Sequence, residues 1–204
     1  MTVRVVTAVA NVGLTDIELR DPVESSLPPS LFYRGARQDV LITAITAHRT
    51  FTGHLDVIER LLAEGVVVRV AILEPGSDAL SRVQKKEKPN LRNEAFSVLG
   101  IIRKTELCDR TGFHLRFLRE LPPFTAVMVD GDAEPVGSAP KDESGRLRIQ
   151  PGLASVPQSQ GLILQFAKLP VEPTGSAYAS GFDLFADDLR CQWRDLTEDA
   201  RDRL

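Results

Sequence analysis

Hydrophobic and polar positions along the chain predict an alternation of strands and helices. Residues 39–47 (DVLITAITA) form a clear apolar strand pattern, and residues 66–73 (VVVRVAIL) are a nearly continuous apolar run, typical of a strand buried on both faces. Between them, residues 54–64 carry apolar side chains at helical spacing, and Gly65 follows as a suitable helix end. A strand, a helix and a strand in this order predict a parallel, right-handed βαβ unit.

The rest of the chain extends this pattern. We expect, in order, a strand or ordered arm (3–14), a short helix (31–38), a loop (48–53), a loop (74–90), a helix (91–104), two strands (113–121, 125–131), a mobile loop (137–160), a strand (161–169) and a helix (182–203). The predicted fold is α/β, with a mixed, largely parallel central sheet flanked by helices. Residues 1–30 are assigned to an N-terminal arm with a Pro/Ser-rich connector, and residues 31–204 to one domain.

Composition and charge narrow the class of protein. The chain has 204 residues, 43% of them hydrophobic and 26% charged, which is ordinary for a globular domain. Its formal net charge of −3 disfavours a nucleic-acid partner without excluding one. Only Cys108 and Cys191 are present, too few for a disulfide framework, and neither a long apolar run nor a signal-peptide pattern occurs. We therefore expect a cytoplasmic protein that does not enter a membrane.

The most informative segment is PFTAVMVDGDAEPVGSAP, which runs from Pro123 to Pro140. Its spacing resembles the phospholipase D superfamily signature H-x-K-x4-D-x6-G-S-x-N, with the catalytic positions changed. Pro123 stands at the position of the His and Thr125 at that of the Lys. Asp130 and Ser138 fall in register, and Pro140 replaces the Asn. The resemblance implies the fold and the ancestry of that superfamily, with a degenerate active site.

Further segments carry the same resemblance, which extends over roughly residues 31–196. They are ARQDVLITAITA with the following helix and EGVVVRVAILEPGS, the strand GLILQF, and the closing FDLFADDLRCQW. The segment PPFTAVMVDGD is also similar to divergent phospholipase D-like modules of bacterial regulators, which have lost the same His and Lys. Since no second copy of the signature occurs, the resemblance implies a single-copy module that pairs as a homodimer.

The substitutions bear directly on chemistry. In the superfamily, the His forms a covalent phosphoryl intermediate through a nitrogen lone pair, and the Lys neutralises phosphate oxygens in the transition state. Pro123 has no such lone pair, and Thr125 donates one hydrogen bond without a charge. We therefore expect a catalytically inactive module that senses a ligand or serves as an interaction domain. An active phosphodiesterase or nuclease that uses another nucleophile, such as His48, is the alternative.

A candidate binding crevice follows from the predicted strands, because ligands of open α/β sheets bind beyond the carboxyl ends of strands. His48 and Arg49 follow the first core strand, and Glu74 and Ser77 follow the second. With the signature residues, the candidate ligand-binding set is His48, Arg49, Glu74, Ser77, Thr125, Asp130 and Ser138. Arg49 and the N–H groups opening helix 54–64 favour a small anion, whereas Glu74 opposes a highly charged one. No metal or nucleotide motif occurs, so we expect no metal and no cofactor.

Two remaining features have two interpretations each. The basic stretch QKKEK at 84–88 is either a solvated loop or a phosphate or nucleic-acid contact, and its lack of interleaved aromatic residues weakens the second interpretation. The last helix carries an apolar stripe, which reads either as core or as a dimer face. The residues of this stripe are Phe182, Phe185, Leu189, Trp193 and Leu196.

Overall fold

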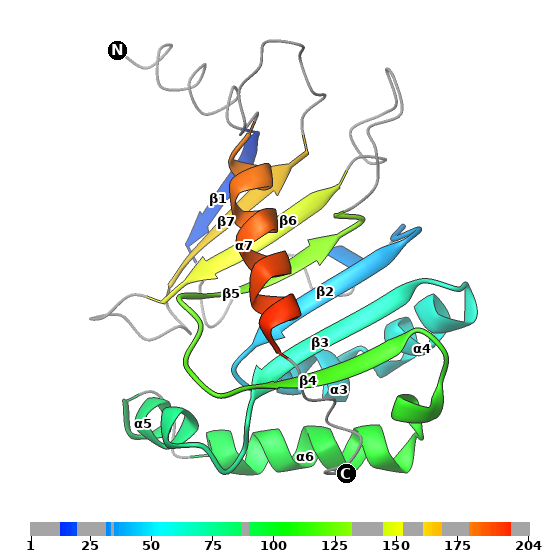
Figure 1. Ribbon diagram of the computed structural model, residues 1–204, viewed down its shortest axis with the longest axis vertical. Coiled ribbons are helices and arrows are strands. Elements are labelled where there is room, and N and C mark those ends of the chain that lie inside the picture. The colour runs from blue at the N-terminus through cyan, green and yellow to red at the C-terminus, as the bar shows by residue number, and fades with distance from the viewer. Residues whose placement is uncertain are drawn as a thin grey trace.

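The computed structural model describes residues 13–19, 32–33, 35–86, 90–131, 145–152, 161–168 and 180–196. In these parts of the chain, seven strands form one sheet in the order β1-β7-β6-β5-β2-β3-β4 (Figure 1). The strands are β1 (Leu14–Leu19), β2 (Asp39–Ala44), β3 (Val67–Leu73), β4 (Phe113–Leu118), β5 (Phe124–Val129), β6 (Arg146–Pro151) and β7 (Leu162–Ala167).

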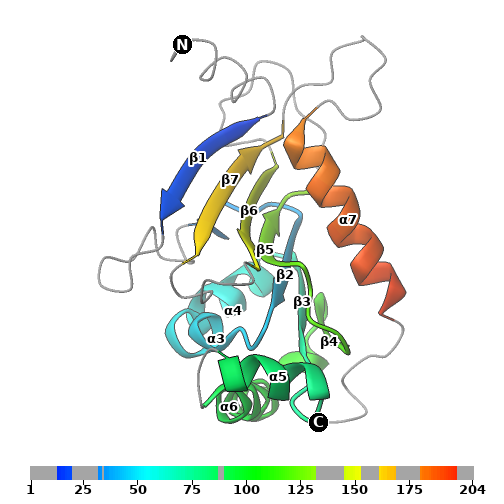
Figure 2. The ribbon, with the colours of Figure 1, turned by 90° about the vertical axis from the view of Figure 1, so that its left-hand side faces the viewer.

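Helices cover both faces of this sheet. They are α3 (His48–Gly53), α4 (Leu55–Ala63), α5 (Asp78–Lys86), α6 (Leu91–Lys104) and α7 (Gly181–Asp195), with a short 3-10 helix η1 (Leu107–Asp109). Helices α3, α4 and α6 lie on one face, and α7 crosses the other (Figures 1 and 2). Helix α5 packs beside α6 at the end of the sheet where β3 terminates. The sheet is therefore the middle layer of three.

The predicted βαβ unit is confirmed. Strands β2 and β3 are adjacent and parallel, with Asp39 paired to Val67 and Ala44 to Ile72, and α4 connects them across one face. Gly65 has a φ of +83°, the left-handed conformation expected just after the helix. The apolar runs predicted these elements because strands buried on both faces leave no room for polar side chains.

The expectation of a largely parallel sheet is wrong. Only the β2–β3 and β3–β4 pairs are parallel, whereas the pairs β2–β5, β5–β6, β6–β7 and β1–β7 are antiparallel. The physical reason is the order of the strands in the sheet. Strands β5, β6 and β7 follow one another among the described elements and are neighbours in the sheet, so each runs back alongside the last in a meander.

Three segments predicted as loops contain regular structure. Residues 48–53 form α3, residues 78–86 form α5, and residues 146–151 form β6. The expected helix over 31–38 is shorter, since the chain turns at Gly35 and is extended by Asp39. Most of the predicted arm at 3–14 lies outside the described residues, and the first described strand begins at Leu14.

Beside a cluster that joins the ends of β3 and β4 to α5 and α6, two further hydrophobic clusters hold the layers together. One joins β2, β3 and β4 to α3, α4 and α6, and includes the fully buried Tyr33, Phe51 and Ile58. The other lies under α7, where Phe182 and Leu189 are buried against Met128 of β5. The apolar stripe of the last helix is therefore core along much of its length. Ser180 begins this helix and accepts a hydrogen bond from the Asp183 N–H, as an N-cap does.

Candidate functional site

Strand direction brings several chain segments to one edge of the sheet. The carboxyl ends of β2, β3 and β4 meet there, and the Glu74 N–H donates to the Leu118 carbonyl at 3.0 Å. Strand β5 runs antiparallel to β2, with Ala126 paired to Thr43, so β5 begins at this same edge. Thr125, which the signature spacing aligns with the lysine of the phospholipase D superfamily, therefore lies at the carboxyl edge of the sheet.

The strand that pairs with the signature strand supplies two residues that the sequence did not single out. Thr125 pairs with Gln150 of β6, and Val127 pairs with Arg148. Alternation along both strands places all four side chains on one face of the sheet. This face is the one covered by α3 and α4, because Val127 packs against the core beneath those helices. Thr125, Arg148 and Gln150 are each half-buried.

Tyr33 connects this face to α3. Its side chain is buried, and its hydroxyl lies 3.3 Å from the Thr50 Oγ1 atom. Burial raises the pKa of Tyr33 above its ordinary value of about 10, while the Thr50 hydrogen bond and the positive charge of Arg148 lower it in part. The charge of Arg148 therefore acts on the phenol of Tyr33. We call Thr125, Arg148, Gln150, Tyr33 and Thr50 the signature-face cluster.

His48 and Arg49 begin the helix that carries Thr50. His48 is half-buried, and its Nδ1 atom is buried without a hydrogen-bond partner. Arg49 is exposed. The Thr52 hydroxyl donates to the His48 carbonyl at 2.8 Å and does not cap helix α4, which begins after His54 without a side-chain cap.

Asp130 lies at the opposite end of the sheet. It follows β5, and its N–H donates to the Asp39 carbonyl where β2 begins. Five residues separate it from Thr125, which is about 17 Å along a strand. Its carboxylate accepts hydrogen bonds from the N–H groups of Arg37, Gln38 and Asp39 at 2.8–3.3 Å. The structure therefore separates Asp130 from the other candidate residues and gives it a role in holding the start of β2.

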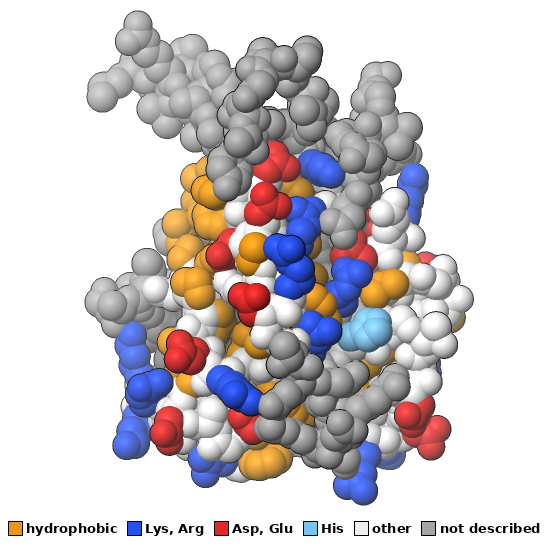
Figure 3. All heavy atoms as spheres, viewed as in Figure 1, with side chains coloured by type: hydrophobic (Ala, Val, Ile, Leu, Met, Phe, Trp, Pro, Cys, Tyr) orange, Lys and Arg blue, Asp and Glu red, His pale blue; other side chains and the backbone are white. Residues whose placement is uncertain are grey.

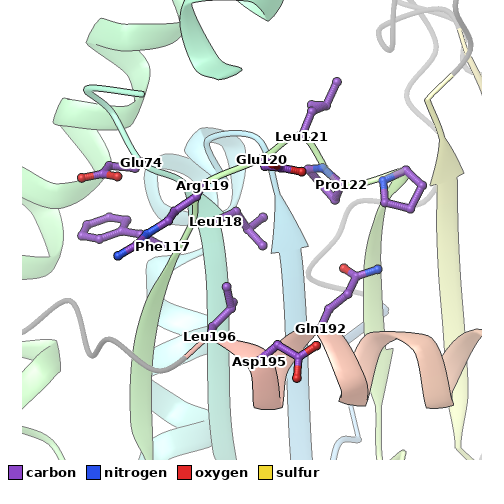
Figure 4. A pocket seen from close by; sticks show the side chains of 11 residues that line it. Glu74, Phe117, Leu118, Arg119, Glu120, Leu121, Pro122, Gln192, Asp195 and Leu196 are labelled. Atoms are coloured by element: carbon purple, nitrogen blue, oxygen red, sulfur yellow. The ribbon is translucent and has the colours of Figure 1, made fainter. Parts of the chain in front are cut away.

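Glu74 and Ser77 follow β3 but have different surroundings. The Ser77 hydroxyl accepts a hydrogen bond from the Leu80 N–H at 3.1 Å, so it caps helix α5. Glu74 lines a pocket of about 550 Å³, the edge pocket, between the β4–β5 connection and the end of α7 (Figure 4). Pro123, at the position of the family's nucleophile, lines the same pocket. His48, Arg49 and Thr125 are not among its lining residues.

Strand pairing gives Thr125 a partner from outside the sequence signature. Ser138 lies outside the described residues. The partner strand is β6, which begins eight residues beyond Ser138 in the sequence, and the residue opposite Thr125 is Gln150. The alternation of polar and apolar residues in RLRIQ was the available signal, and the surrounding Gly, Ser and charged residues obscured it.

A basic surface lies beside α7 on the other face of the sheet. Figure 3 shows a short stripe of Lys and Arg side chains there, next to acidic side chains. Arg190 pairs with Asp187 at 2.7 Å, and Arg116 stacks on the Trp193 ring with its guanidinium carbon 4.3 Å from the centroid. Arg190 and Arg116 are therefore engaged within the protein. Of the predicted basic stretch, Lys85 and Lys86 form the last turn of α5.

Solved structures of other proteins resemble this chain in the general arrangement of strands and helices. No family model and no curated protein matches the sequence. TrmBL2, an archaeal chromatin protein whose structure shows a novel mode of DNA binding, aligns at a TM-score of 0.49 with 10% identity over 95% of this chain. This chain spans 60% of the length of TrmBL2. Nuc from Salmonella typhimurium, a phospholipase D family member, aligns at 0.48 with 13% identity, over 90% of this chain and 97% of Nuc. At these scores, no site residue is transferred.

Among the described residues, no helix is long and apolar enough to cross a membrane. Within the same residues, no group of three or more His, Cys, Asp or Glu side chains is arranged to hold a metal ion.

Proposed function

We propose that this chain is a phospholipase D-like binding module without phosphodiesterase activity, and that it holds an anionic, phosphate-bearing ligand at the signature-face cluster. The observation that supports this proposal is the position of Arg148. It projects from the strand paired with the signature strand, on the same face as Thr125, where the family has its lysine. The cation of Arg148 therefore lies beside Thr125, at the position of the family's lysine, although it comes from a different strand.

The local geometry suits an anion. Residues directly opposite on antiparallel strands have Cβ atoms about 5 Å apart, and diagonal neighbours about 7–8 Å. Gln150 is opposite Thr125 and Arg148 is diagonal to it, so a hydroxyl, an amide and a guanidinium surround one spot at the start of β5. Such groups donate charge-assisted hydrogen bonds to a phosphate, each contributing about 1.5–3 kcal/mol. The positive charge of Arg148 also lowers the pKa of the buried Tyr33 in part.

The signature positions of this chain supply no nucleophile for catalysis by the family mechanism. Pro123 and Thr125 occupy the positions of the His and Lys, and Asp130 is engaged by three backbone N–H groups far along the strand. Binding without turnover is the activity that remains. We propose a ligand-sensing role because the charge of Arg148 on β6 acts on Tyr33, whose hydroxyl lies 3.3 Å from the Thr50 Oγ1 atom on α3. A homodimeric, cytoplasmic module spanning residues 31–204 completes the proposal.

Binding and turnover should be measured on the same variants. We expect inorganic phosphate or a nucleoside monophosphate to bind in isothermal titration calorimetry, and Arg148→Ala to weaken binding by about 1–3 kcal/mol. Arg148→Lys should restore part of the affinity, because it keeps the charge but loses the planar fork. Arg146→Ala is the matched control, since Arg146 lies on the same face of the same strand, about 13 Å along the strand from the Thr125 position and about twice as far from it as Arg148.

Equal affinity of the wild type and Arg148→Ala for phosphate would contradict the proposed site. Hydrolysis of bis(p-nitrophenyl) phosphate should not exceed background in any variant. Hydrolysis that disappears in His48→Ala would replace the binding module with a phosphodiesterase that uses His48. Circular dichroism of each variant checks that the fold is retained.

A further inference from the structure

The edge pocket is a cavity whose chemistry differs from that of the signature-face cluster. Its lining combines an apolar floor, which includes Phe117, Leu118 and Leu196, with polar groups on its rim (Figure 4). A volume of about 550 Å³ falls within the range of pockets that hold small molecules. The mixture of apolar floor and few polar groups is also typical of such pockets.

The charge on this rim is predominantly negative. Glu74, Glu120 and Asp195 line the pocket, and Arg119 is the one cationic residue among the described residues that line it. Figure 4 shows Glu74 on one side, Glu120 above and Asp195 below, so the carboxylates come from three different segments around the cavity. An anion entering the pocket would meet this excess of carboxylates, whereas a cation would be attracted by it.

Gln192 supplies an independent sign of the ligand. Its Nε2 atom donates to the Asp188 carboxylate at 2.7 Å, which fixes the orientation of the amide, because the oxygen cannot donate to a carboxylate. Among the described residues, its Oε1 atom has no hydrogen-bond partner, and this atom is buried. Figure 4 shows this side chain extending from α7 toward the β4–β5 connection. A buried carbonyl oxygen without a donor is costly, so a ligand N–H group that reached this atom from the pocket would be stabilised there.

We infer that the edge pocket binds a small organic cation, an aliphatic amine whose methylene groups cover the apolar floor and whose ammonium groups meet the rim carboxylates and Gln192 Oε1. This site is separate from the proposed anion site. Arg148 and Gln150 are absent from the residues that line the pocket, which lies by α7 on the other side of the sheet from α3. One chain would thus carry two ligand sites of opposite charge preference.

A matched pair of probes tests this inference. Hexane-1,6-diamine and hexane-1,6-diol have the same chain length, and only the diamine carries charge. We expect calorimetry at low salt to detect the diamine and not the diol. The double variant Glu120→Gln/Asp195→Asn should weaken diamine binding by about 5- to 30-fold, the effect of two exposed ion pairs at the upper end of their range. Gln192→Leu, which keeps the volume, should also weaken it by about fivefold.

The controls separate this pocket from the rest of the molecule. Glu64→Gln removes an exposed carboxylate just after α4, outside the pocket, and should leave the diamine affinity unchanged. Arg148→Ala should also leave it unchanged, so failure of the anion site and failure of the edge pocket are distinguishable. Equal affinity for diamine and diol, no binding of the diamine, or wild-type affinity in the double variant would each overturn the inference.

Discussion

Asp130 is predicted to be a structural residue, and its replacement should cost stability while leaving the anion site in place. The carboxylate accepts from the N–H groups of Arg37, Gln38 and Asp39, at the point where β2 enters the sheet. The side chain is only 6% exposed, and its backbone has a φ of +51°. Asp130→Ala would leave three N–H groups without this acceptor and would put alanine in a left-handed conformation.

The magnitude follows from these contacts. Arg37 and Gln38 are exposed residues, so water can replace part of the loss at their N–H groups, at about 1 kcal/mol each. The Asp39 N–H belongs to a buried residue, and leaving it unpaired costs about 1–3 kcal/mol. Left-handed backbone adds about 1 kcal/mol for alanine. We therefore expect Asp130→Ala to lower the free energy of unfolding by about 4–6 kcal/mol.

Urea unfolding followed by circular dichroism measures this loss. Asp130→Gly separates the two causes, because glycine accepts the positive φ but still leaves the N–H groups unpaired. Asp130→Asn should cost less than Asp130→Ala, since it retains an acceptor oxygen and tolerates the left-handed backbone. Asp56→Ala, an exposed carboxylate on α4, is the control and should change little. A loss below about 1 kcal/mol in Asp130→Ala would refute the structural role.

Three further outcomes are expected in the same unfolding assay. Ser180→Ala removes the N-cap of α7 and should cost about 1 kcal/mol. Gly145→Ala places a Cβ atom 2.8 Å from a backbone carbonyl and 3.0 Å from the Phe182 ring, and should cost about 1–3 kcal/mol, whereas Gly131→Ala meets only a flexible Met side chain and should cost less. Burial raises the pKa of Tyr33, so the contribution of its neutral phenol to the free energy of unfolding is intact below about pH 10 and is lost as the pH rises further. Tyr33→Phe should therefore reduce the loss of stability at alkaline pH.

The sequence predicted the parallel half of the fold well. Strands β2 and β3 and helix α6 (Leu91–Lys104) were expected within a few residues of their observed bounds, because each has a strong apolar periodicity. Strand β4 was also expected, and its exposed His114 lies opposite the buried Phe113 and Leu115, as the alternation indicated. Long periodic segments leave few alternatives for packing.

The antiparallel half was harder to predict. Strand β6 has only Leu147 and Ile149 as apolar positions and lies in a segment rich in Gly, Ser and charge. Its pairing with β5 is a long-range contact that no local pattern encodes. Without β6, neither Arg148 nor Gln150 could be assigned to the site. Helix α5 was missed because Pro75, Gly76 and Ser77 read as a loop, although Ser77 is also a good N-cap.

The candidate site was therefore predicted in part. Glu74 lies at the carboxyl edge of the sheet and lines a pocket there, and Thr125 lies at the same edge. The sequence did not predict the position of Asp130, because a signature gives the order of residues along a strand but not the end of the sheet at which each residue lies. Ser77 has a local role as a helix cap, which a hydroxyl before a helix often has.

The proposed anion site is tested most directly by a crystal structure of the protein soaked with tungstate, a tetrahedral oxyanion that is located by its anomalous scattering. The site proposed here predicts a peak within hydrogen-bond distance of Arg148 and Gln150, at the start of β5 beside Thr125, and no peak there in Arg148→Ala crystals. A peak only at the edge pocket or elsewhere on the surface, with the signature-face cluster unoccupied, would contradict it.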